Sequence, residues 1–167
     1  MKPTNRDALM QRFDSLGISV TTRDHAAVFT VDEAKLVHDD IPGGHCKNLF
    51  CKDEKGVLWL IVALEDSAIN LKTVPAIIGS RRLSFGKPEL LLEALGVTPG
   101  SVTPFGLIND TSVRVNVILD AAMMAEPVLN FHPLENNATT SIQANDLVAF
   151  IRSCGHEPQI FRVSGLA

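Results

Sequence analysis

The apolar run at residues 57–64, VLWLIVAL, constrains the fold of this 167-residue chain more than any other feature. Successive side chains of a β-strand point to opposite faces, so this run is apolar on both faces and needs a cover on each. It is far shorter than the roughly 20 residues that span a bilayer. A polar turn at 53–56 joins it to an extended segment at 45–52. We predict a hairpin whose second strand is central in a sheet covered by helices.

Helical periodicity supplies that cover at five places. The segments combine apolar residues three and four positions apart with capping residues, early prolines or closing glycines. Thr4 is the expected N-cap of the first helix, and Pro75 is expected to kink the third or to divide it into two shorter pieces. The predicted helices cover residues 4–16, 30–38, 71–78, 88–95 and 143–154.

Short extended segments alternate with these helices. The segment 97–106 contains two prolines and two glycines, and we expect a stiff loop there that presents backbone N–H groups. A polar turn is expected at 23–25. This interleaved order favours an α+β (mixed α/β) fold with a central mixed sheet, and 46% hydrophobic content over residues 1–167 fits a single domain. The other predicted strands are 18–21, 113–119, 128–131 and 139–142.

The charge balance limits the kind of nucleic-acid partner. Fifteen Lys and Arg against nineteen Asp and Glu give a net charge of -4, which argues against a protein that coats nucleic acid through its overall charge. A local basic cluster remains, formed by Arg81, Arg82 and Lys87. The residues near the N-terminus lack the apolar stretch of a signal peptide, so we expect a cytoplasmic protein without a membrane segment.

The cysteines and histidines do not form a recognisable metal site. The three cysteines form no C-x-x-C pair, and the five histidines form no H-x-x-x-H pair. We therefore predict free thiols, no metal and no cofactor. Cys46 and Cys51 lie close to Lys47, either on the other side of the sheet or in the wall of a pocket.

Several short segments together carry a resemblance. The chain resembles the freestanding aminoacyl-tRNA editing proteins of the YbaK/prolyl-tRNA synthetase-associated family, and within it the branch that removes alanine from proline tRNA. The segments occur in the family's order and cover nearly the whole chain, so the ordered set is far more specific than any one of them. They are HAAVFTVDEA at 25–34, KNLF at 47–50, RRLSF at 81–85, GSVTPFGL at 100–107, FHPL at 131–134 and NN at 136–137.

The resemblance implies a trans-editing hydrolase that cleaves the ester of a mischarged aminoacyl-tRNA. Such an ester is already activated, so its hydrolysis needs a positioned water, a stabilised oxyanion and a held acceptor end. In the family a ribose hydroxyl of the substrate is thought to assist the water. The chain agrees in lacking a G-x-S-x-G motif and any tyrosine.

The resemblance also implies a set of catalytic residues. Lys47 corresponds to a lysine that contacts the ribose or phosphate end of the substrate, and the alternative is an ordinary surface lysine. The G-x-x-x-P loop offers backbone N–H groups, and His132 offers a hydrogen-bonding ring or else has a structural role. The implied catalytic set is Lys47, Asn48, Gly100, Thr103 and His132.

Selection of alanine over the larger proline should be steric, because one or two methylenes are worth only about 1–3 kcal/mol by attraction. The resemblance places the substrate pocket at Val28, Phe29, Phe50, Ser101 and Pro104, although core packing explains at least one of the three apolar residues equally well. The expected tRNA-binding cations are Lys47, Arg81, Arg82 and Lys87.

Other functions remain open at this stage. The same fold can edit cysteinyl-, seryl- or threonyl-tRNA, act as a non-catalytic RNA- or partner-binding module, or hydrolyse a small ester. The expected partner is the acceptor end of a mischarged tRNA, with a synthetase or elongation factor as a further partner. We expect the protein to act as a monomer.

Overall fold

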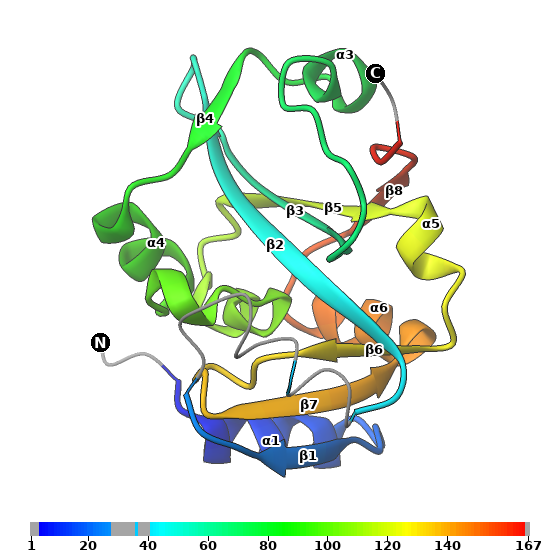
Figure 1. Ribbon diagram of the computed structural model, residues 1–167. Coiled ribbons are helices and arrows are strands. Elements are labelled where there is room, and N and C mark those ends of the chain that lie inside the picture. The colour runs from blue at the N-terminus through cyan, green and yellow to red at the C-terminus, as the bar shows by residue number, and fades with distance from the viewer. Residues whose placement is uncertain (1–3, 28–35, 37–40, 166–167) are drawn as a thin grey trace.

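The computed structural model describes residues 4–27, 36 and 41–165. Eight strands in these residues form one mixed sheet in the order β1-β7-β6-β2-β3-β5-β8, and β4 pairs with β2. In Figure 1 the long β2 runs diagonally across the molecule, from β4 to β6. The strands are β1 Thr21–Asp24, β2 Gly44–Asp53, β3 Leu58–Leu64, β4 Leu83–Phe85, β5 Val115–Asp120, β6 Val128–Phe131, β7 Ala138–Gln143 and β8 Gln159–Phe161.

Helices cover both faces of this sheet. None of the described helices is long and apolar enough to cross a membrane. The helices are α1 Arg6–Ser15, α3 Val74–Ile78, α4 Pro88–Leu95, α5 Ala121–Met124 and α6 Ala144–Ser153, with the 3-10 turns η1 Pro99–Ser101 and η2 Pro104–Asn109.

Strand β3 is central, as its sequence predicts. It pairs antiparallel with β2 on one side and parallel with β5 on the other. Its alternating side chains enter two separate cores. Leu60 lies in the larger core, under α1, α4 and α6, and Ile61 lies in the smaller core, under α3. The predicted hairpin and the helical cover of both faces are confirmed.

Four phenylalanine rings form the centre of the larger core. Phe105 packs edge-to-face against Phe13, Phe131 and Phe150, with ring centroids 5.2–5.6 Å apart. Aromatic pairs favour this arrangement. These rings come from α1, η2, β6 and α6. The core thus joins distant segments of the chain beneath one face of the sheet.

The predicted helix starts differ from the structure in two places. Asn5, and not Thr4, caps α1 by accepting a hydrogen bond from Ala8 N–H, while the N–H of Thr4 donates to Asn109. Pro75 lies in the first turn of the short α3 and does not kink a longer helix, because a proline is tolerated where helical N–H groups have no partner.

Three other predictions also change. The first strand begins at Thr21, because Ile18 is buried in the larger core just after α1. The predicted turn at 23–25 therefore overlaps β1. The loop at 97–106 contains η1 and the start of η2, since prolines fit the first positions of 3-10 turns. The predicted helix at 30–38 lies outside the described residues except for one position.

Strand β8 and helix α5 were not predicted from the sequence, because each is too short to carry a clear periodic pattern.

Two buried aspartates tie the far end of the chain to β5. Asp110 lies 2.8 Å from His156 Nε2 and accepts the N–H groups of Arg114 and Val115. Asp120 accepts hydrogen bonds from both the N–H and the hydroxyl of Ser164, at 3.2 and 2.7 Å. Both carboxylates are nearly inaccessible to solvent. Their hydrogen bonds offset the cost of that burial.

Replacing Asp110 by Ala removes the acceptor of three hydrogen bonds, two of which are buried. We expect the free energy of unfolding to fall by about 3–5 kcal/mol, as when one partner of a buried pair is lost. Urea denaturation at neutral pH measures this change. The exposed Asp14, on α1, provides the control, and an equal loss in Asp14→Ala would contradict the assignment.

The same contact predicts a dependence on pH. Burial alone would raise the pKa of Asp110, but hydrogen bonds from His156 and from two backbone N–H groups outweigh it and hold this pKa below its ordinary 3.8. The stabilisation is therefore complete above about pH 4 and lost as the pH falls through the lower folded-state value. The difference in unfolding free energy between the native chain and Asp110→Asn should shrink in acid, and a constant difference would contradict this.

Candidate active site

A small cavity of about 30 Å³ lies where β2 meets β6 and β7. This is room for about one or two water molecules. Polar side chains supply most of its wall. The residues around it are His45, Cys46, Asn48, Asn130, Phe131, His132 and Thr139.

Asn48 contributes to this cavity a polar atom whose hydrogen-bonding capacity is unsatisfied. Its Oδ1 is buried and has no hydrogen-bond partner among the described residues. A buried acceptor without a donor costs about 1–3 kcal/mol. The free energy of the empty site is therefore lowered by any ligand or water that brings a donor to this oxygen.

His132 enters the same cavity with a defined ring orientation. Its Nδ1 lies 3.0 Å from the carbonyl oxygen of Ala138. Because a carbonyl only accepts, Nδ1 carries the hydrogen, and in the neutral ring Nε2 is then the acceptor nitrogen. Pro133 follows directly and favours the extended backbone at His132.

Further polar groups buttress the cavity, and sequence reasoning did not single them out as site residues. Nε2 of His25 lies 2.8 Å from Oγ1 of Thr139. Asn130 donates to the carbonyl oxygens of Pro42 and Gly44, at 3.1 and 3.2 Å, and accepts from Ser141. These bonds hold the start of β2 against β6. Of these residues, only His25 belongs to a segment that carries the family resemblance, since it is the first residue of HAAVFTVDEA.

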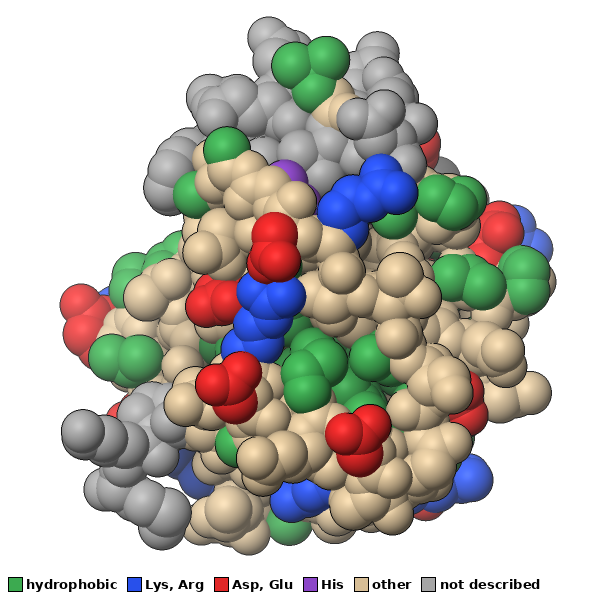
Figure 2. All heavy atoms as spheres, turned by 90° about the horizontal axis from the view of Figure 1, so that it is seen from below, with side chains coloured by type: hydrophobic (Ala, Val, Ile, Leu, Met, Phe, Trp, Pro, Cys, Tyr) green, Lys and Arg blue, Asp and Glu red, His purple; other side chains and the backbone are tan. Residues whose placement is uncertain are grey.

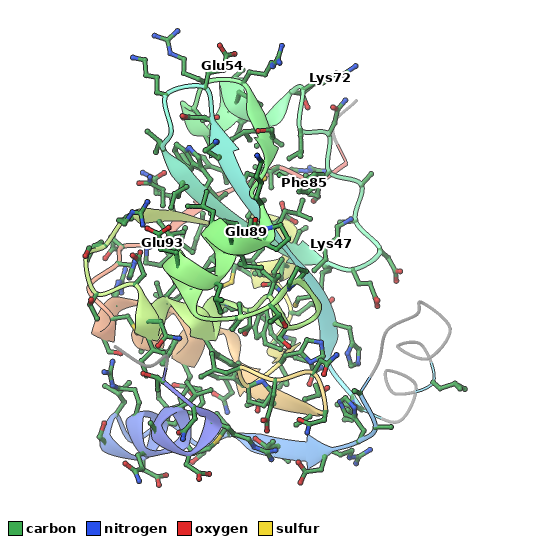
Figure 3. All side chains as sticks on the ribbon, turned by 90° about the vertical axis from the view of Figure 1, so that its left-hand side faces the viewer. Lys47, Glu54, Lys72, Phe85, Glu89 and Glu93 are labelled. Carbon is green, nitrogen blue, oxygen red and sulfur yellow. The ribbon has the colours of Figure 1, made fainter. Side chains whose placement is uncertain are left out.

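Lys47 lies on the other face of β2. Its Nζ donates to the carbonyl oxygen of Ser67, and Lys47 is not among the residues that line the cavity. Figure 3 shows it on the side of β2 away from α4. Side-chain alternation explains this, because Lys47 and Asn48 are neighbours in one strand. The structure therefore separates the two residues that the KNLF motif joins.

The 65–70 loop that holds Lys47 is itself held by the chain's later residues. The N–H of Gly165 donates to the carbonyl oxygen of Ala68, and Ile69 forms a β-bridge with Ser164. Ser164 in turn hydrogen-bonds Asp120. The position of the Lys47 ammonium thus depends on a continuous series of contacts that ends on β5.

The predicted G-x-x-x-P loop reaches the neighbourhood of the cavity through its exposed glycine. A Cβ on Gly100 would lie 3.4 Å from Nδ2 of Asn136, in the turn that follows His132. Thr103 is fully buried and its Oγ1 accepts the N–H of Phe105 at 3.2 Å. The hydroxyl of Thr103 is therefore used in capping η2.

Three more of the expected pocket residues pack inside the protein. Ser101 and Pro104 are buried beside η1 and η2. Phe50 belongs to the larger core, and Gly86 lies so close that a Cβ there would be 2.4 Å from its ring. Val28 and Phe29 lie outside the described residues.

The structure does not bring the basic cluster into the cavity. Arg81 and Arg82 are exposed, and the N–H of Arg81 lies 3.4 Å from Asp53 at the far end of β2. Five strand residues separate Asp53 from Asn48, or about 16 Å. Lys87 is the residue just before α4. Any ligand that contacts both the cavity and these cations must therefore be long.

The two cysteines of β2 lie on opposite faces. Cys46 lines the cavity, and Cys51 lies in the smaller core. Burial raises the pKa of each thiol to about 12. Since the thiolate is the nucleophilic form, neither side chain is suited to attack an ester near neutral pH.

Comparison with known proteins identifies the family. The model of the aminoacyl-tRNA editing domain matches residues 25–150, a range that includes every residue around the cavity. The chain belongs to the aminoacyl-tRNA editing domain family. The predicted family is thus confirmed.

Relatives of this editing domain cover nearly its whole length. The prolyl-tRNA editing protein ProX of Acetoanaerobium sticklandii is 34% identical over 152 residues, which are 90% of this chain and 93% of that protein. Prolyl-tRNA synthetase associated domain-containing protein 1 of Bos taurus is 36% identical over 160 residues, 93% of each chain.

A solved structure shares the fold of the editing domain. The crystal structure of a candidate trans-editing enzyme for prolyl tRNA synthetase superposes with a TM-score of 0.72 at 18% identity, over 98% of this chain and 99% of that one. The predicted mixed α/β fold is therefore confirmed.

Thiol labelling tests the chemistry assigned to the cysteines. Because burial keeps Cys46 and Cys51 protonated, iodoacetamide should label the folded protein at both positions much more slowly than the protein in urea. Mass spectrometry of the labelled peptides measures the two rates. Labelling of Cys46 in the folded protein as fast as in urea would contradict this result.

Proposed function

We propose that this editing domain hydrolyses the ester of a mischarged aminoacyl-tRNA, with alanyl-tRNA carrying proline's anticodon as the preferred substrate. The observation that carries the proposal is the buried, unpartnered Asn48 Oδ1 beside His132 in a very small cavity. A cavity of this size admits at most the methyl side chain of alanine and leaves no room for the ring of proline, two residues that attraction alone separates poorly. The name of the relative from Acetoanaerobium sticklandii supports a role in prolyl-tRNA editing, and the name of the relative from Bos taurus supports a link to prolyl-tRNA synthetase.

The proposed chemistry needs no protein nucleophile. Asn48 accepts a hydrogen bond from the substrate and fixes its orientation, and His132 holds a polar group of the acceptor end. Backbone N–H groups around Gly100 stabilise the oxyanion. A ribose hydroxyl of the substrate assists the attacking water, and the ester bond breaks to release free amino acid and tRNA.

Lys47 has a separate part in this proposal because it lies on the other face of β2. A compact ammonium is suited to a phosphate oxygen of the acceptor end. In the free protein this ammonium is held at the carbonyl oxygen of Ser67. Arg81, Arg82 and Lys87 would then contact the tRNA further from the ester.

The proposal also extends to the setting of the protein. We infer that residues 1–167 act as one monomeric domain, in the cytoplasm, without a cofactor and on tRNA that a prolyl-tRNA synthetase has mischarged. An elongation factor is a further partner that competes for the same charged tRNA. The name of the relative from Bos taurus includes an association with prolyl-tRNA synthetase.

A panel of mischarged tRNAs tests the proposed reaction. The native chain should release alanine from proline tRNA faster than it releases cysteine, serine or threonine from theirs. Asn48→Ala and His132→Ala should each lower kcat/KM by about 100-fold, a typical loss for a group that acts on the transition state. Asn145→Ala, at an exposed position of α6, is the matched control.

The outcomes of this panel separate the alternatives. Faster release of another amino acid would replace the alanine substrate. Absence of hydrolysis on every tRNA would leave a non-catalytic binding module, and hydrolysis that excess tRNA does not inhibit would indicate a small-ester hydrolase.

The salt dependence of tRNA binding provides a second test. On the face seen in Figure 2, basic and acidic side chains are interspersed and form no continuous basic patch. Only a few cations are expected to contact phosphates, each adding roughly -0.7 to -0.9 to the slope of log K against log salt. We expect a slope shallower than about -4. A slope near -10 would indicate many phosphate contacts and contradict this.

A further inference from the structure

Phe85 is the one phenylalanine in the described part of the chain that is largely exposed. Its side chain is 65% exposed, whereas Phe13, Phe105 and Phe150 are at most 1% exposed. It lies on β4, which pairs only with the end of β2. An aromatic ring left in water at a sheet edge gains nothing for folding, so a ligand that covers it is favoured.

Phe85 opens onto a groove of about 380 Å³ between β4 and α4. Lys52, which pairs with Ser84, and Lys87 bring two ammonium groups to the groove. Neither lysine forms an ion pair with another described residue. Figure 3 shows Phe85 at the end of β4, on the same side of β2 as Lys47. The groove is lined by Lys52, Ser84, Phe85, Lys87, Glu89, Leu90 and Glu93.

The two glutamates do not make this groove simply acidic. Glu93 is paired with Arg114 at 3.0 Å, so its charge is largely offset. Glu89 remains, and a carboxylate accepts hydrogen bonds from the exocyclic amine of cytosine. An exposed ring, two unpaired ammonium groups and one such acceptor match an unpaired nucleotide better than they match an apolar peptide.

We propose that Phe85, Lys52, Lys87 and Glu89 form a stacking platform for the unpaired C-C-A end of the tRNA. A base stacks on the Phe85 ring and the lysines contact the adjoining phosphates. The platform gives a physical role to the edge at which β4 ends. This inference rests on the proposed function, because it takes the charged tRNA as the ligand.

The platform and the cavity lie within reach of one short strand of RNA. Lys52 and Asn48 are four residues apart on β2, or about 13 Å, and their side chains lie on one face. Phe85 pairs with Cys51 and therefore leaves β4 on the other face, so the RNA must pass around the edge at β4 to contact all three. Phe50 lies between Lys52 and Asn48 and is buried under Gly86. The protein surface between these two residues therefore has no opening at Phe50. Three stacked nucleotides span about 10 Å and more when extended.

Binding of uncharged proline tRNA to Phe85 variants tests the platform. Phe85→Ala should weaken the Kd by about 5- to 150-fold, the effect of losing one stacked base. Phe85→Trp should bind at least as tightly as the native chain, because the larger ring still stacks. Ile160→Ala is the matched control, since Ile160 is 51% exposed on β8 at the other edge of the sheet.

The same measurement on tRNA without its C-C-A end locates the contact. All four proteins should bind the shortened tRNA equally well. The inference is overturned if Phe85→Ala binds intact tRNA as the native chain does, if its loss persists on the shortened tRNA, if Phe85→Trp fails like Phe85→Ala, or if no tRNA binds.

This experiment separates the platform from the enzyme. A Phe85-dependent contact with the C-C-A end would support the platform even if the native chain hydrolysed no ester. Conversely, rapid deacylation together with a Kd that does not change in Phe85→Ala would overturn the platform and leave the proposed reaction standing.

Discussion

Leu58 and each of the five residues that follow it on β3 are buried, so this strand needs a packed layer on both sides. The two cores meet that need from opposite faces. The position of β3 then fixes the register of β2, because each residue from Cys46 to Lys52 is paired with a defined residue of β3. A shift of one position would exchange Asn48 and Lys47 between the faces. The site therefore depends on the burial of a strand that contributes nothing to it chemically.

The cavity joins segments that are far apart in the chain. Asn48 comes from β2, and His132 and Thr139 come from the β6 and β7 region. Parallel pairing of β2 with β6 involves only Gly44 and His45, and side-chain bonds from Asn130 reinforce it. Polar residues thus support the narrowest junction of the sheet and also form the site. Changes to Asn130 should affect both properties at once.

Elements with strong local patterns were predictable from the sequence. The hairpin, α4 and α6 are confirmed. The hairpin has an apolar strand after a polar turn, and both helices have apolar periodicity and a glycine near their end, with a proline start in α4 alone. The start of β1 was not predictable, since tertiary packing draws Ile18 into the core. The motif KNLF indicated the right strand for the site. Alternation along that strand then separates its two polar residues, and Asn130 and Thr139 become site residues only through strand pairing that no local pattern reveals.

The contacts that hold the Lys47 ammonium involve residues that are synthesised at different times. Ser67 accepts from Lys47, but its loop is fixed by Ser164 and Gly165. Ribosomes add roughly 5–20 residues per second, so these partners are made about ten seconds after Lys47 itself. During that interval the hairpin of β2 and β3 has no such support. This side of the molecule is therefore completed only late in biosynthesis, after the strand that bears the lysine has been translated.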